Sequence, residues 1–398
     1  MAVLLIGTLD TKGIELAFVR DRLNEAGVKS LILDAGVLGA ATIPADITRE
    51  EVFVAAGTTL AEMVRKNDRG LAVTKAAGGA AVMAERLYRE KRITGVLGLG
   101  GSAGTTIGTS AMRALPYGVP KLMVSTLASG QVAHYVGVRD VLMMPSVVDI
   151  SGLNRLSKMI LSNAAAAMAG MVQAPALNLE QGSSTRTIAA TMFGVTTPCV
   201  EHARKLLEQK GNEVLVFHAT GTGGRTMEAM IRDGLIAGVL DLTTTELADE
   251  LVGGILSAGK DRLTAAAIRG IPQVISVGAL DMANFGPRET VPERFKNRLF
   301  HIHNANVTLM RTTPEENDAL GKEIAEKASA ARGPTTILLP LQGISAIDKE
   351  GGPFWWPEAD LALFQSIQNW IGPWVKIIEV DCHINDPAFA EAAVRVLG

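Results

Sequence analysis

Cysteine is almost absent from this chain of 398 residues, which has only Cys199 and Cys382. Two cysteines rule out the dense disulfide framework of small secreted domains, and no Cys-x-x-Cys pair indicates a zinc site. Proline (16 residues) and aromatic side chains (4%) are also scarce, and glycine follows no collagen-like period. The composition therefore predicts a globular cytoplasmic protein with both thiols reduced.

The chain also lacks a surplus of charge and a long hydrophobic run. Its 38 basic and 41 acidic residues give a formal net charge of −3, without the basic face that a nucleic-acid binder usually needs. The longest uncharged stretch, residues 159–179, includes Asn163 and Gln173 and is predicted to be a buried alanine-rich helix, not a membrane span. The apolar run at residues 3–6 is too short for a signal peptide. We expect neither a nucleic-acid nor a membrane partner.

Glycine, by contrast, is abundant, with 41 residues, about one in ten. Short apolar runs, such as residues 3–6 and 93–99, alternate with segments of helical periodicity, such as residues 14–26. Strands that are apolar throughout are typical of parallel sheets with helices on both faces. The predicted fold class is therefore α/β, with doubly wound parallel sheets. Further strands are expected at residues 30–33, 121–125, 141–144, 336–339 and 375–380, and a terminal helix at 387–397.

An internal repeat indicates that the two halves of the chain are related. Four segments recur in the same order: residues 7–11 and 194–198, 23–35 and 207–219, 93–99 and 236–242, and 118–120 and 270–272. Four weak matches in one order favour duplication of a domain. We therefore predict a first domain at residues 1–175 and a second at 186–398. A polar connector is predicted at 173–186.

Polar and glycine-rich segments follow the predicted strands of the first half, at the sheet edge where ligands bind in such folds. Glycines at a strand-to-helix turn let backbone N–H groups face an anion, and the hydroxyls of Ser102, Thr105 and Thr106 would donate to phosphate oxygens. The sequence therefore predicts a phosphate or nucleotide site. Its candidate residues are Thr8, Asp10, Thr11, Lys12, Asp34, Gly36, Gly100, Gly101, Ser102, Gly104, Thr105, Thr106, Ser129 and Gly130.

Within this set, Lys12 would add positive charge, while Asp10 or Asp34 would bind ribose hydroxyls or a hydrated Mg²⁺. The spacing is not that of a P-loop, and the glycines in residues 98–104 miss the dinucleotide fingerprint by one residue. Close packing of strand against helix would explain one such glycine turn. Several polar strand ends on one edge favour a ligand site.

The second half has an equivalent edge with more titratable groups. His218, Asp281 and His383 each follow a predicted strand and are candidates for proton transfer. A phosphate or carboxylate would be held by Arg311 and by one glycine turn, whose residues are Thr220, Gly221, Thr222, Gly223 and Gly224. No helical His-x-x-x-His or His-x-x-Glu spacing occurs, and no metal site is predicted.

At these loops the sequence resembles a known family. Residues 7–12, 100–105, 128–130 and 149–154 are similar to the ATP-binding domain of the tomato mosaic virus resistance protein, a domain shared by many uncharacterised bacterial and fungal proteins. In the second half, residues 218–224, 278–286, 308–313 and 383–387 also resemble it. The resemblance covers essentially the whole chain. It departs at Gln131, where many relatives have aspartate.

The resemblance implies two Rossmann-like subdomains, ATP bound by the N-terminal one, and self-association into a homo-oligomer. Its phosphate loops correspond to Thr8, Asp10, Thr11, Lys12, Gly101, Ser102, Gly104 and Thr105. Two compatible hypotheses follow. In the first, the chain is an ATP-binding protein. In the second, it is an enzyme acting on a small anionic metabolite in the second domain or between the domains, with ATP as a possible second substrate. A purely structural module would leave the second polar edge without a purpose.

Overall fold

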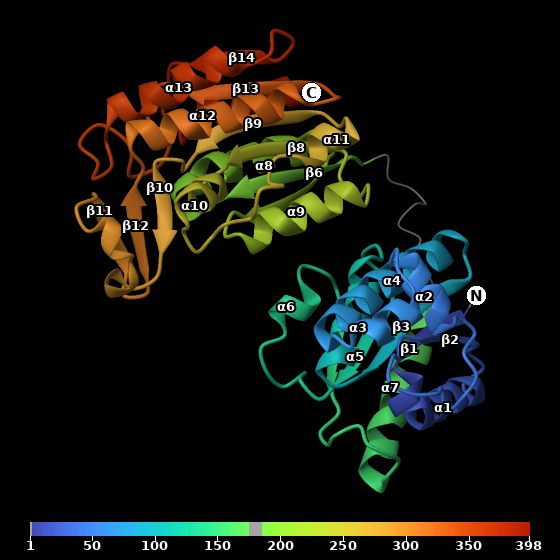
Figure 1. The fold of residues 1–398 in the computed structure, drawn as a ribbon. Coiled ribbons are helices and arrows are strands. Elements are labelled where there is room, and N and C mark those ends of the chain that lie inside the picture. Colours follow the sequence, from blue (N-terminus) through green and yellow to red (C-terminus); the bar gives the residue numbers. More distant parts are fainter. Residues whose placement is uncertain (1, 175–184) are drawn as a thin grey trace. The chain divides into compact units, whose positions relative to one another are not determined.

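The computed structural model describes residues 2–174 and 185–398, and the chain divides into two compact units, Met1–Asn178 and Leu179–Gly398 (Figure 1). The division falls within residues 175–184, which lie outside the described residues. Most of the predicted connector, 173–186, lies there too. None of the helices in the described part of the chain has both the length and the apolar character needed to cross a membrane.

The first unit is built on a five-stranded parallel sheet of order β2-β1-β3-β4-β5. Its strands are β1 (Ala2–Gly7), β2 (Ser30–Asp34), β3 (Ile93–Gly100), β4 (Lys121–Ser125) and β5 (Leu142–Pro145). Its helices are α1 (Leu9–Glu25), α2 (Arg49–Ala55), α3 (Leu60–Lys66), α4 (Arg69–Arg89), α5 (Ser102–Arg113), α6 (Ala133–Val136) and α7 (Arg155–Gln173). The predicted strands are thus present, and α7 covers the predicted alanine-rich helix as far as Gln173, while residues 175–179 of that stretch lie outside the described residues.

Strand β1 shows why this sheet is apolar on both faces. All six of its residues are buried. Leu4 and Ile6 pack into one hydrophobic cluster with α4 and α5, whereas Val3 and Leu5 point to the opposite face and pack with α1 and α7. Figure 1 shows helices on both sides of the sheet. A strand covered on both faces has no polar alternation, as the sequence predicted.

The strand order of the first unit reverses between β1 and β3. The chain leaves β1 toward β2 on one side, then crosses to β3 on the other side. Neighbouring loops diverge at such a point and leave a crevice beyond the carboxyl ends of the strands, where α/β proteins bind ligands. The connection from β2 to β3, residues 35–92, carries α2, α3 and α4 beside this point.

The second unit repeats this topology with six parallel strands in the order β14-β13-β9-β8-β6-β7. Its strands are β6 (Thr187–Met192), β7 (Glu213–His218), β8 (Gly238–Thr243), β9 (Gln273–Gly278), β13 (Thr335–Pro340) and β14 (Lys376–Val380). Its helices are α8 (Thr197–Gln209), α9 (Thr222–Arg232), α10 (Glu246–Val252), α11 (Ala265–Arg269), α12 (Pro314–Ser329), α13 (Pro357–Trp370) and α14 (Pro387–Leu397). Because β6 and β8 are placed as β1 and β3 are, the recurring sequence segments occupy equivalent topological positions.

Two features differ from the sequence prediction. A small antiparallel sheet formed by β10 (Met282–Phe285), β12 (Val307–Arg311) and β11 (Phe300–Asn304) is inserted after β9 (Figure 1). The helix predicted at residues 14–26 is preceded by a helical turn that starts at Leu9, and the two join across a kink at Lys12, whose backbone is not helical. The Asp34 carboxylate accepts the Leu9 N–H at the start of this turn. The all-parallel, doubly wound prediction is confirmed for the two main sheets.

Candidate functional site

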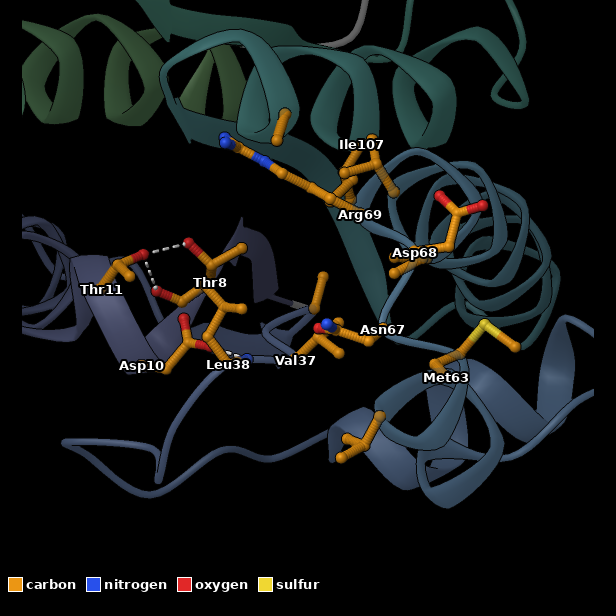
Figure 2. Close-up of a pocket in the computed structure, with 16 residues that line it drawn as sticks. Thr8, Asp10, Thr11, Val37, Leu38, Met63, Asn67, Asp68, Arg69 and Ile107 are labelled. Atoms are coloured by element: carbon orange, nitrogen blue, oxygen red, sulfur yellow. Dashed lines mark hydrogen bonds between the residues drawn. The ribbon is translucent and has the colours of Figure 1, made fainter.

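A cavity of about 300 Å³ lies at the β1/β3 switch point of the first unit (Figure 2). Its walls come from the start of α1, the loop after β2, the stretch from α3 to α4, and the first two turns of α5. The lining residues are Thr8, Asp10, Thr11, Ala35, Val37, Leu38, Met63, Val64, Asn67, Asp68, Arg69, Ala72, Val73, Ala76, Ala103 and Ile107. Three of the predicted nucleotide-binding residues, Thr8, Asp10 and Thr11, are among them.

The turn from β3 into α5 requires its glycines. A Cβ atom on Gly100 would lie 2.8 Å from the Cα atom of Gly104, and a Cβ on Gly104 would lie 3.1 Å from the Leu99 carbonyl oxygen. Helix α5 starts after Gly101 with no side-chain cap, and Ala103 in its first turn reaches the cavity. The first N–H groups of a helix have no partner within the helix and favour an anion.

The two sides of the cavity differ in polarity. Figure 2 shows Thr8, Asp10 and Thr11 on one side and Met63 and Asn67 on the other. The apolar lining comes mainly from α3, α4 and α5 and from the loop after β2, namely Val37, Leu38, Met63, Val64, Ala72, Val73, Ala76 and Ile107. An apolar group attached to a polar, hydroxyl-bearing one fits this division.

Arg69 is the cationic side chain of this lining. It is exposed and forms no ion pair within the described part of the chain. Neighbouring Asp68 accepts the Leu71 N–H at 2.9 Å and so caps α4. An arginine without a protein counter-ion at a helix start suits a phosphate, because the guanidinium donates paired N–H groups.

Asp34, at the end of β2, has a structural role instead of the predicted ligand contact. Its Oδ1 accepts the N–H groups of Leu9 at 3.0 Å and Gly36 at 2.9 Å. Its Oδ2 accepts the Arg49 guanidinium, with Nε at 2.7 Å. Both oxygens are engaged and the side chain is buried. Asp34 therefore joins β2 to α1 and α2.

Asp10, in the first turn of α1, has hydrogen-bond partners for only one of its two carboxylate oxygens. Its Oδ2 accepts the N–H groups of Leu38 at 2.8 Å and Gly39 at 3.3 Å. Its Oδ1 is buried, and no donor among the described residues reaches it. The hydroxyls of Thr8 and Thr11 bond to each other at 2.6 Å instead.

Several other predicted nucleotide contacts are absent from the cavity wall. The Lys12 ammonium donates to the Ile150 carbonyl. The buried Thr105 hydroxyl donates to the Gly101 carbonyl at 2.8 Å and lies 2.7 Å from the Ser125 hydroxyl, so it does not face a ligand. Eight further candidates do not line the cavity, namely Gly36, Gly100, Gly101, Ser102, Gly104, Thr106, Ser129 and Gly130. Of these, Gly36 and Gly100 shape the backbone beside it.

Sequence reasoning missed the wall built by α3 and α4. Its side chains, among them Met63, Asn67 and Arg69, do not follow a strand, so the rule that ligands gather at strand ends does not find them. The available signal was the length of the β2-to-β3 crossover, residues 35–92, which is far longer than a crossover with one helix requires.

In the second unit the glycine turn already holds an anion from the protein itself. The backbone N–H groups of Gly221 and Gly224 donate to Glu246 Oε1 at 2.7 and 3.0 Å. A Cβ on Gly224 would overlap the Glu246 carboxylate. The phosphate or carboxylate predicted at Thr220, Gly221, Thr222, Gly223 and Gly224 is thus replaced at this position by an internal carboxylate.

The Glu246 carboxylate belongs to a buried ion cluster at the β6/β8 switch point. The fully buried Arg262 guanidinium pairs with Glu246 at 2.6 Å, with Asp241 at 2.6 Å and with Glu228 at 3.6 Å. Burial raises the pKa of Glu228, and the Arg262 charge opposes this shift. The cluster thus joins β8, α9 and α10 through one guanidinium.

Arg311, predicted to bind a substrate anion, is fully buried and engaged by protein groups. Its guanidinium donates to Asp360 at 2.8 Å and to the Phe354 carbonyl at 2.8 Å, and it lies 3.5 Å from Asp348. Burial raises the pKa of Asp360 to about 8. In the structure the Arg311 guanidinium is thus engaged by internal carboxyl groups and a backbone carbonyl.

The structure does not bring the three proton-transfer candidates together. Asp281 Oδ2 accepts the Ser345 hydroxyl at 2.8 Å, and His383 Nε2 bonds to the Ser345 carbonyl at 2.8 Å. His218 instead ends the edge strand β7, where its ring packs on Phe193 with centroids 5.6 Å apart. Asp281 follows β9, which lies three strand positions from β7 in the sheet. Three positions correspond to about 14 Å between the two strands. Direct or one-water proton transfer cannot span that gap.

His383 also lines a shallow cleft beyond β13 and β14, together with Gln342, Lys349 and Trp355. Its Nδ1 accepts the Asn385 N–H at 3.1 Å, so Nε2 carries the proton that it donates to Ser345. Both ring nitrogens are therefore used within the protein. No group of three or more His, Cys, Asp or Glu side chains in the described ranges is placed to hold a metal ion.

Comparison with known proteins matches residues 1–177 to the N-terminal domain and residues 185–398 to the C-terminal domain of an uncharacterised protein family, UPF0261. A UPF0261 protein of Clostridium tetani is 51% identical over 396 residues, covering 99% of this chain and 98% of that protein. UPF0261 protein RA0729 of Rhizobium meliloti is 48% identical over 394 residues, covering 98% and 97%.

A plant protein is also similar. The ToMV resistance protein Tm-1(GCR237) of Solanum lycopersicum is 42% identical over 416 residues, covering 98% of this chain and 55% of that protein. The chain thus spans about half the length of the plant protein. Among solved structures, UDP-N-acetylglucosamine 2-epimerase from Rickettsia bellii is 11% identical with a TM-score of 0.23, covering 69% of this chain and 78% of that one. A similarity of that size carries no argument about function.

Proposed function

The chain belongs to the uncharacterised protein family UPF0261, and from this premise we propose that its first unit binds ATP in the cavity at the β1/β3 switch point. The observation that carries the proposal is the position of this cavity. It joins the loops after β1 and β2 to the uncapped first turn of α5. Parallel α/β sheets bind nucleotides at this place.

The division of the walls assigns the parts of the nucleotide. The adenine ring packs among the apolar side chains, such as Val37, Met63 and Ile107. The phosphates extend toward the first turn of α5, where backbone N–H groups and the positive end of the helix dipole favour negative charge. Arg69 pairs with the phosphates. The volume of about 300 Å³ is at the lower end of small-molecule pockets and encloses the nucleoside better than the triphosphate.

ATP is preferred over other nucleotides because of the resemblance to the ATP-binding domain of the plant resistance protein. Mg²⁺ enters the proposal as the ion that accompanies the triphosphate, bound mainly by phosphate oxygens and water. Self-association, which the same resemblance implies, belongs to the proposal as well and is measured as the mass of the particle with and without ATP. The second unit has no part in it, since the Glu246 carboxylate occupies the glycine turn that follows β7.

Mg-ATP is expected to stabilise the first unit and leave the second unchanged. At an ATP concentration 100 times Kd, ligand binding adds about 2.7 kcal/mol to the free energy of unfolding. All four tryptophans, Trp355, Trp356, Trp370 and Trp374, lie in the second unit, so their fluorescence reports that unit alone. Scanning calorimetry should show one transition moving upward with ATP, while the fluorescence transition stays in place.

A matched pair of variants in α5 locates the binding. Ala103→Phe places a ring in the cavity and is expected to abolish the stabilisation by ATP. Ser110→Phe adds the same ring two turns further along the helix, away from the cavity. This variant should still be stabilised by ATP. An unchanged calorimetric profile of the wild type with ATP would refute the proposal. Equal stabilisation of the Ala103→Phe variant would place ATP elsewhere.

A further inference from the structure

The unpaired oxygen of Asp10 is a polar atom of the cavity that the placement of adenine and phosphates leaves unexplained. Asp10 Oδ1 is buried and has no donor among the described residues, although the other oxygen accepts two backbone N–H groups. A buried acceptor without a partner costs free energy, and more so when it is charged. The folded chain would recover this cost if a ligand supplied a donor.

The carboxylate of Asp10 is also fixed in place. Leu38 and Gly39 hold Oδ2 through their N–H groups. Behind the carboxylate runs the backbone of Gly36, where a Cβ would lie 2.7 Å from Asp10 Cγ. Its partners and its backing are thus set by the backbone, which holds the carboxylate in one orientation beside the cavity. Such preorganisation lowers the cost of binding.

Asp34 is not available for the same purpose. An acidic residue at the end of β2 is the usual partner of the ribose in doubly wound folds. Here that residue is Asp34, whose oxygens are engaged by Leu9, Gly36 and Arg49. Asp10 lies on the neighbouring loop, lines the same cavity and has the free acceptor.

The kind of donor follows from the surroundings. Asp10 belongs to no group of three or more His, Cys, Asp or Glu side chains in the described ranges that could hold a metal ion. In the proposal above, Mg²⁺ takes its ligands mainly from phosphate oxygens and water, which leaves Oδ1 for another donor. An adenine amine is a poor fit, because Figure 2 shows Asp10 on the side of Thr8 and Thr11, away from Met63. Between a base on the apolar side and phosphates at α5 lies the sugar, which donates through its hydroxyls.

We propose that Asp10 Oδ1 accepts a ribose hydroxyl, so that this cavity selects ribonucleotides over deoxyribonucleotides. The inference rests on the proposed function and adds to it the class of nucleotide. The usual sugar contact of the fold has moved from the end of β2 to the first turn of α1, because Arg49 occupies Asp34. A hydrogen bond to a charged acceptor makes the preference large, about tenfold or more in Kd.

Calorimetric titration of the full chain with ATP, 2′-deoxy-ATP and 3′-deoxy-ATP, each with Mg²⁺, tests this inference. At least one deoxy analogue is expected to bind about tenfold more weakly than ATP, or worse. In the Asp10→Asn variant, which removes the charge at nearly constant shape, the analogues and ATP should bind with similar affinity. Asp68→Asn is the matched control, since it removes the same charge from the lining while asparagine still caps α4. The Asp68→Asn variant should still bind ATP more tightly than the deoxy analogue that the wild type disfavours.

The outcomes separate the inference from the proposal beneath it. If ATP and both analogues bind the wild type equally, the ribose contact is refuted and ATP binding stands. If none of the three binds, the proposed function fails, and the inference with it. A preference that survives in Asp10→Asn also refutes the role of Asp10. The wild-type series is informative by itself if the variant does not fold.

Discussion

Replacing Arg262 by methionine is expected to destabilise the second unit by about 3–5 kcal/mol at neutral pH, enough to unfold a marginal domain. The guanidinium is the shared partner of Asp241, Glu246 and Glu228, and its side chain is completely buried. Without it, buried carboxylates lose their counter-charge. Chemical denaturation followed by tryptophan fluorescence measures the effect, since every tryptophan lies in this unit.

The Arg262→Met variant should recover part of its stability at acid pH. Burial raises the pKa of Glu228 in the wild type, while Arg262 lowers it, so removing Arg262 raises this pKa further. A carboxyl whose pKa is higher in the folded state favours folding as the pH falls. Arg204→Met is the control, because its pair with Glu201 is 37% exposed and is worth about 0–1 kcal/mol. Equal losses in the two variants would contradict the ion cluster's role.

The stability of the second unit is expected to fall as the pH rises from about 5 to about 8. Burial, reinforced by the Asp348 carboxylate, raises the pKa of Asp281 to about 7 and that of Asp360 to about 8, while Arg311 opposes both shifts. Burial also raises the pKa of Asp249 to about 7. Unfolded aspartates titrate near pH 3.9, so in this window the folded state holds more protons and each rise in pH favours unfolding.

Each protonated carboxyl contributes a slope of about 1.4 kcal/mol per pH unit below its folded pKa. Asp281→Asn, which resembles the protonated acid, should reduce the slope in tryptophan-detected denaturation. The exposed Asp261→Asn should leave it unchanged. A stability that is flat or rises between these pH values would show that the buried carboxyls are ionised and paired.

The fold followed from the sequence because strong local patterns agreed with it. The run at residues 3–6 is apolar on both faces of β1, and the helix predicted at 387–397 coincides with α14. The antiparallel strands β10 to β12 were not predicted, because their residues were interpreted as loops that follow a strand. Their pairing depends on contacts such as Met282 with Arg311, which are distant in the sequence.

The candidate site was predicted less completely, for physical reasons that individual residues show. Thr8, Asp10 and Thr11 were found because ligands gather at strand ends, whereas Arg69 reaches the cavity from a crossover helix. The glycine turn at residues 221–224 has the sequence of an anion site. Only the fold reveals that Glu246, more than twenty residues away, fills it. Residue type does not show whether an acceptor such as Asp34 is already engaged.

Hydrogen–deuterium exchange of the full chain with and without Mg-ATP tests the central claim most directly. If ATP binds in the cavity of the first unit, backbone amides at residues 8–11, 60–76 and 101–107 should exchange more slowly when it is present. Residues 221–246 should exchange unchanged, because the Glu246 carboxylate already holds that turn. Protection of residues 221–246, or no protection at the three cavity segments at saturating ATP, would contradict the account.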